Sequence, residues 1–111
     1  MDVIKVLRYI TRSKKVPFAD WLAELGNSHQ AIVLERIARL RLGNYGDCKN
    51  IKSGGGVWEL RIQYGPGYRV YFGKDGNTIV ILLLGGDKGS QHRDIDKAKR
   101  YWIDYKESKH G

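Results

Sequence analysis

The stretch VWELRIQYGPGYRVYF, residues 57–72, predicts a β-hairpin. Apolar and polar residues alternate on both sides of Gly65-Pro66-Gly67, as they do in two half-buried strands around a turn. Glycine tolerates positive φ and proline fixes φ, so these three residues suit the turn itself. A three-residue loop then gives the pairs of the apolar face: Tyr64 with Tyr68, Ile62 with Val70, and Leu60 with Phe72.

The other face of the predicted hairpin is polar. Gln63 is expected opposite Arg69. Arg61 is expected opposite Tyr71, with Glu59 one step further along the strand. A register shift of one residue would turn Arg69 toward the core, so the register is well specified. Two arginines beside a carboxylate and a phenol suit an anionic ligand, although an ordinary solvated sheet face is the simpler alternative.

The composition indicates one small domain, residues 1–111, with a basic surface. A hydrophobic content of 41% is too high for a disordered chain, and the length allows one core. Lys and Arg total 20 against 12 Asp and Glu, which gives a formal net charge of +8. This charge favours a polyanionic partner such as nucleic acid or an acidic protein. The apolar run at 79–84 is too short to cross a bilayer, so no membrane association is expected.

Several functional classes are disfavoured by residues that the sequence lacks. Cys48 stands alone, so no internal disulfide can form. The single Cys and three His show no metal-ligand spacing, so no metal site is expected. The glycines at 54–56 lack the GxxxxGK[ST] pattern, and no cofactor is expected. The chain begins Met1-Asp2 without a basic and apolar leader, which favours a cytoplasmic protein.

The predicted helices and strands do not alternate along the chain. The order β-α-α-β-β-β-α favours an α+β fold, with helices packed on one face of an antiparallel sheet and the other face open. Residues 43–56 are polar and glycine-rich and predict a long loop that carries Lys49 and Lys52. The remaining elements are expected as a strand at 3–11, a helix from Pro17 to Gly26, a helix with its apolar stripe at 33–40, a strand at 78–84 that ends in a glycine-rich break at 85–89, and a helix after Ser90.

The polar hairpin face and the start of the last helix are expected to converge on one cationic site. A helix N-terminus presents unpaired N–H groups and a partial positive charge, so it suits a phosphate. Lys88 and Gln91 would flank that phosphate. His92 lies in the same first turn, where an exposed helix residue is the simpler interpretation.

Such a site could cleave RNA without a metal ion. Glu59 would take the proton of a ribose 2′-OH, and Arg61 and Arg69 would stabilise the charge that builds on the phosphoryl oxygens. The proton donor stays open among Lys88, His92 and Tyr71, and Tyr71 could instead pack in the core or stack on a base.

Four stretches of the chain together resemble the RelE/ParE superfamily of bacterial toxins, and most closely its HigB-like addiction-module killer proteins. They cover nearly the whole chain and comprise 57–72, PFADWLAEL (17–25), RIARLRLGNYGDCK (36–49) and IVILLLGGDKGSQHRDIDKAKRYW (79–102). The resemblance implies a RelE-like α+β fold with a twisted antiparallel sheet. It also implies the toxin of a type II toxin–antitoxin module, a ribosome-dependent mRNA endoribonuclease that inhibits translation, with a helix-turn-helix antitoxin as partner.

The resemblance also assigns roles to particular residues. Arg69 matches the family's catalytic arginine, Arg61 and Glu59 match charged positions on the preceding strand, and Lys88 matches a basic residue after the last strand. The C-terminal Tyr or His of RelE-type nucleases has no clean match here. The ParE branch uses the same fold to poison DNA gyrase, so a gyrase poison is the first alternative. A non-catalytic basic module that binds RNA or protein is the second.

Overall fold

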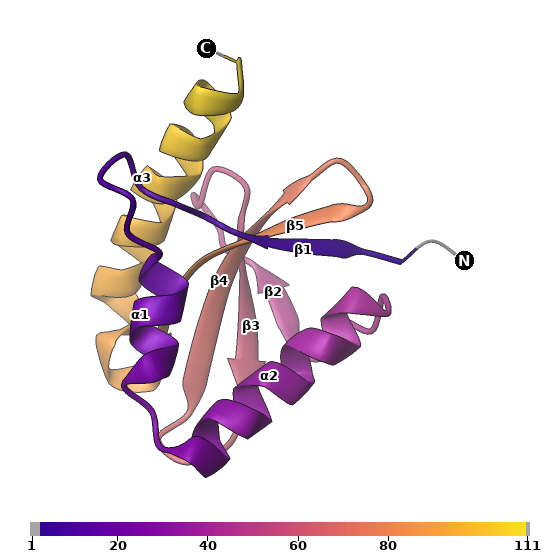
Figure 1. The fold of residues 1–111 in the computed structure, drawn as a ribbon, viewed down its shortest axis with the longest axis vertical. Coiled ribbons are helices and arrows are strands. Elements are labelled where there is room, and N and C mark those ends of the chain that lie inside the picture. Colours follow the sequence, from indigo (N-terminus) through magenta and orange to yellow (C-terminus); the bar gives the residue numbers. More distant parts are fainter. Residues whose placement is uncertain (1–2, 111) are drawn as a thin grey trace.

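The computed structural model of the chain describes residues 3–110 and contains one five-stranded sheet with three α-helices (Figure 1). The elements are β1 (Lys5–Arg8), α1 (Pro17–Ala23), α2 (Asn27–Arg41), β2 (Cys48–Asn50), β3 (Val57–Ile62), β4 (Tyr68–Asp75), β5 (Ile79–Asp87), the 3-10 turn η1 (Lys88–Ser90) and α3 (Gln91–His110). The strand order is β1-β5-β4-β3-β2, which places the hairpin strands side by side within the sheet. The predicted α+β class is confirmed.

The sheet differs from the prediction in two strands. β1 is parallel to β5, whereas all other neighbouring strands are antiparallel, so the sheet is mixed. β2 lies inside residues 43–56, where the composition predicts only a loop. It pairs with β3 and places Lys49 opposite Glu59. This strand has three residues and no apolar alternation, so no periodic signal marks it.

The hairpin register differs from the predicted register by two residues. Leu60 pairs with Val70 instead of Phe72. The connection between the strands is also longer than three residues, since it spans 63–67. A shift of two residues leaves the paired side chains of β3 and β4 on their predicted faces, because side-chain direction alternates with a period of two, whereas Tyr64 lies in the turn and is not paired with Tyr68.

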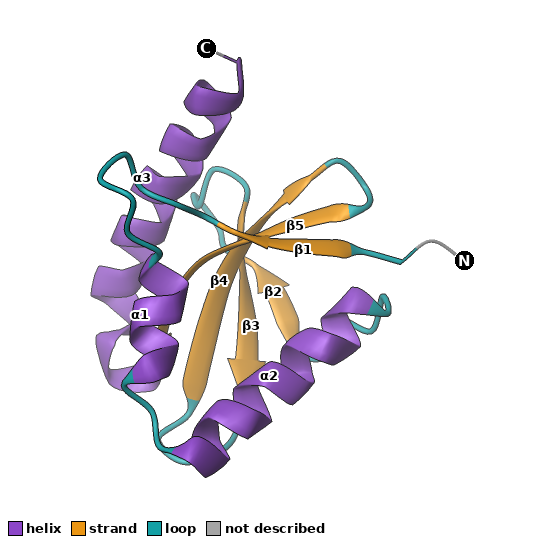
Figure 2. Cartoon of the chain, in the orientation of Figure 1, coloured by secondary structure: helices purple, strands orange, loops and turns teal. Residues whose placement is uncertain are grey.

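Helices cover both faces of the sheet, so the prediction of one open face is wrong (Figure 2). One core joins the sheet to α1 and α2, where Phe18 and Val33 are buried. A second core lies on the opposite face, where Trp102 of α3 packs with Val57 and Leu83. The cause lies in β5, which carries apolar side chains on both of its faces, so both faces must be covered.

Two glycines let the helices approach the sheet closely. A Cβ atom at Gly85 would lie 2.0 Å from the Trp21 ring of α1, and one at Gly73 would lie 2.4 Å from the Trp102 ring of α3. β5 therefore continues through Gly85 and reaches Asp87, although the glycine pair predicts a break there. Gly85 thus allows α1 to pack closely on the sheet, and the chain turns only after β5 ends at Asp87.

Candidate functional site

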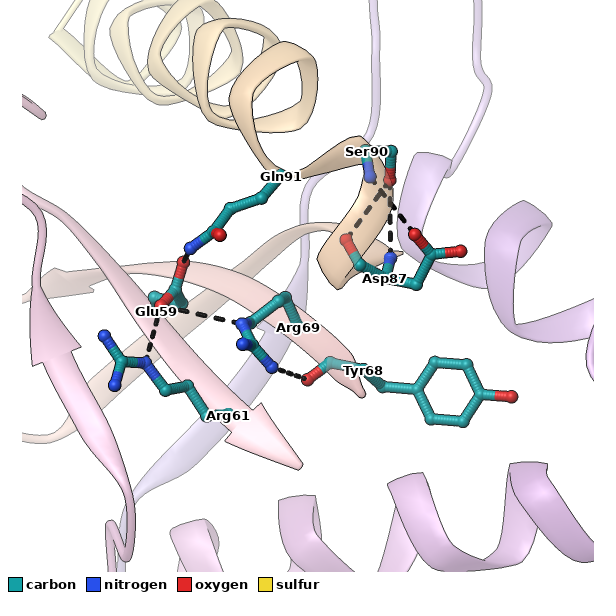
Figure 3. A network of polar contacts seen from close by, with 7 residues as sticks. All are labelled: Glu59, Arg61, Tyr68, Arg69, Asp87, Ser90 and Gln91. Carbon is teal, nitrogen blue, oxygen red and sulfur yellow. Dashed lines mark hydrogen bonds and ion pairs between the residues drawn. The ribbon is translucent and has the colours of Figure 1, made fainter. Parts of the chain in front are cut away.

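The polar end of the hairpin gathers two arginines around one buried carboxylate (Figure 3). Arg61 and Arg69 are direct cross-strand partners on β3 and β4. The Glu59 carboxylate is 2% exposed and accepts a 2.9 Å hydrogen bond from Arg61 Nε, and its Oε1 lies 3.8 Å from Arg69 Nε. Gln91, the first residue of α3, donates to Glu59 Oε2 at 2.6 Å. The hairpin and the start of the last helix therefore meet at Glu59.

The two guanidinium groups differ in their access to solvent. The Arg69 side chain is 11% exposed, and that of Arg61 is 31% exposed. Arg69 Nη1 donates to the Tyr68 carbonyl at 3.1 Å, whereas its Nε has no hydrogen-bond partner within residues 3–110. The hydrogen bond to Glu59 raises the pKa of Arg61 above its ordinary value. Arg61 is therefore a firmly protonated charge that is partly open to solvent, and Arg69 is the more buried of the two side chains.

A capping box determines where α3 begins. The Asp87 carboxylate accepts hydrogen bonds from the N–H groups of Ser90 and of the residue before it, which closes η1. The Ser90 hydroxyl donates to Asp94, and the absent side chain of Gly86 leaves space for that carboxylate. Because η1 leads directly into α3, these contacts fix Gln91 above the hairpin.

Two open pockets flank the cluster. The first has a volume of about 370 Å³ and is lined by the turn 63–67 together with Arg69 and Lys88. The second has a volume of about 260 Å³ and is lined by Lys49, Ile51, Lys52, Glu59, Arg61, Gln91 and Ile95. Every site residue expected from the sequence lines one of these pockets, with the exceptions of Tyr71 and His92.

Tyr71 and His92 lie away from both pockets. Tyr71 is fully buried beneath α3, so the interpretation that it stacks on a base is wrong. Burial raises the pKa of the Tyr71 phenol, and the nearby Glu59 and Asp94 carboxylates add to this effect. A buried phenol that holds its proton so firmly is poorly suited to be an acid catalyst. His92 is exposed in the first turn of α3.

An aromatic cluster at the hairpin turn is absent from the sequence-based prediction. Tyr64 is 41% exposed and lines the first pocket. Its ring packs edge-to-face on His29 of α2, with ring centres 4.9 Å apart. His29 Nδ1 lies 2.5 Å from the Tyr68 hydroxyl. The available signal was an aromatic residue directly before Gly65-Pro66-Gly67, whereas the contribution of His29 depends on the tertiary fold.

Three further features bear on the chemistry of the chain. Within residues 3–110, no group of three or more His, Cys, Asp or Glu side chains is arranged to hold a metal ion. The Cys48 thiol donates to the Tyr45 carbonyl at 2.9 Å, and burial raises the pKa of this thiol to about 11. It is therefore a poor nucleophile near neutral pH. None of the described helices has the length and apolar character needed to cross a membrane.

Comparison with known proteins identifies the family. Residues 20–102 match the family described as "Phage derived protein Gp49-like (DUF891)", a span that includes the hairpin and the cluster around Glu59. The chain therefore belongs to the Gp49-like family, which is of the RelE-like toxin type. An uncharacterized protein of Haemophilus influenzae Rd is 47% identical over 83 residues, which cover 74% of this chain and 82% of that protein. The narrower HigB-like resemblance stays a prediction.

Proposed function

We propose that the chain is the toxin of a type II toxin–antitoxin module and that it cuts mRNA on the ribosome without a metal ion. One observation carries this proposal: Arg61 and Arg69 face each other across the hairpin, and both approach the Glu59 carboxylate. The basic pockets on either side and the RelE-like family support a nucleic-acid substrate. Inhibition of translation in the cytoplasm would follow from this activity.

The reaction is a transesterification within the RNA. The ribose 2′-OH loses its proton and its oxygen attacks the adjacent phosphorus, and the bond from phosphorus to the 5′ oxygen breaks. The products are a 2′,3′-cyclic phosphate and a 5′-OH end. Arg69 and Arg61 stabilise the negative charge on the phosphoryl oxygens, since preorganised charges act strongly in a site shielded from water. Lys88, which lines the pocket beside Arg69, protonates the leaving oxygen.

Glu59 has two parts in this scheme. In the structure it holds both arginines, and each of its oxygens accepts a hydrogen bond. We assign it as the proton acceptor once the ribose 2′-OH replaces the Gln91 amide at Oε2. The pocket that contains Lys49 and Lys52 provides the approach to this oxygen and binds the flanking phosphates.

The test is the expression of site variants, with mRNA ends mapped by primer extension after brief induction. Arg69→Ala should abolish both growth arrest and new mRNA ends while the protein stays folded. Arg39→Ala is the matched control, because Arg39 is an exposed arginine on α2 that pairs with Glu35 away from both pockets. Full toxicity of Arg69→Ala would show that the site is assigned wrongly.

The same experiment separates the alternatives. A DNA-damage response without new mRNA ends would identify a gyrase poison. RNA binding that falls steeply with salt, without turnover on ribosomes, would identify a non-catalytic module. As a toxin the chain also requires an antitoxin, which we expect to be a helix-turn-helix protein encoded beside it. Co-purification of the two products from one operon tests this partner.

A further inference from the structure

The turn between β3 and β4 carries an exposed aromatic side chain beside the cationic cluster. Tyr64 is the only aromatic residue among the large apolar side chains that the described chain leaves exposed. It lines the same pocket as Arg69 and Lys88, which has a volume of about 370 Å³. An accessible aromatic ring next to two cations is the arrangement that single-stranded nucleic acids use, because bases stack on the ring and phosphates bind the cations.

The ring of Tyr64 rests on His29, which is the first member of a chain of ring contacts. His29 packs edge-to-face against it and is itself positioned by the Tyr68 hydroxyl at 2.5 Å. Tyr68 in turn contacts Trp21 of α1, with ring centres 5.8 Å apart. Gly65 makes this packing possible, since a Cβ atom there would lie 2.9 Å from His29 Cε1. A ring ordered before the ligand arrives loses less entropy on binding.

The turn is also fixed relative to the phosphate-binding side chains. The Gly67 N–H donates to the Tyr64 carbonyl at 3.1 Å, and the Lys88 N–H donates to the Gly67 carbonyl at 2.8 Å. A Cβ atom at Gly67 would lie 3.8 Å from Arg69 Nη1, so the turn passes close to this guanidinium group. The backbone of the turn is therefore tied to the backbone of Lys88 and lies close to the Arg69 guanidinium group.

We infer that this pocket is a nucleobase subsite, in which Tyr64 stacks on the RNA base adjacent to the scissile phosphate. Arg69 and Lys88 hold that phosphate, and the exposed Gln63 amide at the pocket edge reads the polar edge of the base. Stacking accepts every base, so any sequence preference at this position comes from Gln63. The inference rests on the proposed function, because it names the part of the RNA that this pocket binds.

Binding can be measured without cleavage. The probe is a 2′-O-methyl trinucleotide with a central 2-aminopurine, which lacks the attacking hydroxyl and loses fluorescence when its base stacks. Tyr64→Ala should weaken binding roughly 10-fold or more and abolish the quenching, whereas Tyr64→Phe keeps the ring and should bind as the wild type does. Ile103→Ala, an exposed apolar residue on α3 outside both pockets, is the control. Wild-type affinity and quenching in Tyr64→Ala would overturn the inference.

A second measurement separates the subsite from the proposed function. On ribosomes, Gln63→Ala should flatten the base preference next to the cut, and Tyr64→Ala should lower the cleavage rate. If the wild type cuts mRNA and neither variant changes rate or preference, the subsite is refuted while the function stands. If the wild type cuts no mRNA but quenches the probe through Tyr64, the subsite stands and the function is refuted.

Discussion

Glu59 provides the sharpest test of how the cluster is held together. Its side chain is 2% exposed, and it approaches Arg61, Arg69 and Gln91. Glu59→Ala would leave the mostly buried Arg69 guanidinium beside Tyr71 without its counter-charge. It would also remove the acceptor for the other two side chains. The expected outcome is a large loss of stability with the fold retained at room temperature.

The size of this loss follows from the burial of the partners. Removal of one member of a buried ion pair costs about 3–5 kcal/mol. Arg61 is 31% exposed and can turn toward water, so the lower end, about 3 kcal/mol, applies here. With a urea m-value of about 1.5 kcal/mol/M, the unfolding midpoint should fall by about 2 M. Glu59→Gln keeps the shape but loses the charge, and should cost about 1–3 kcal/mol.

The assay is urea unfolding followed by tryptophan fluorescence. Glu35→Ala breaks the exposed pair with Arg39 and should cost about 0.5 kcal/mol or less, so it is the matched control. The double variant Glu59→Leu/Arg69→Leu should be more stable than Glu59→Ala, because no unpaired charge stays buried. A Glu59→Ala variant within about 1 kcal/mol of the wild type would refute the reasoning.

The remaining predictions concern packing and pH. Each of the variants Gly85→Ala and Gly73→Ala drives a methyl group into a tryptophan ring. Each should lower the free energy of unfolding by about 1–3 kcal/mol or more, measured by thermal unfolding. The control is Gly26→Ala, because a Cβ atom there meets nothing within 4 Å. The Cys48 thiol should react slowly with a disulfide reagent at pH 8, since its pKa is raised to about 11, and rapidly in denaturant. This thiol ionises more readily in the unfolded chain, so its contribution should make stability fall from about pH 9 to pH 11, and Cys48→Ala should reduce that slope.

The sequence predicts the class of fold well, and it fails where tertiary pairing decides. Alternation in 57–72 correctly separates the two faces of the hairpin, because a two-residue shift preserves side-chain direction. The register itself depends on the turn, and the glycine pattern favours a shorter turn than the one that forms. β2 carries no apolar period. The covered second face is implied by the apolar run of β5, which the prediction of an open face does not use.

The residues of the site are likewise predicted from the sequence only in part. Charge and spacing suffice to bring Glu59, Arg61 and Arg69 together, since they lie on one face of the hairpin. Charge and spacing do not show that α3 covers Tyr71, because a tyrosine side chain suits either a solvent-exposed surface or a buried core. Nor can they show that His29 of α2 braces Tyr64, since the two residues meet only after the helix packs near the turn.

The parallel pairing of β1 with β5 has a consequence for the synthesis of the chain. β1 is translated before its hydrogen-bonding partners, Ile79–Leu82, which follow it by more than 70 residues. The hairpin between them can form from neighbouring residues, whereas the edge strand must wait for a distant one. A nascent chain of this protein therefore cannot complete its sheet until β5 has left the exit tunnel.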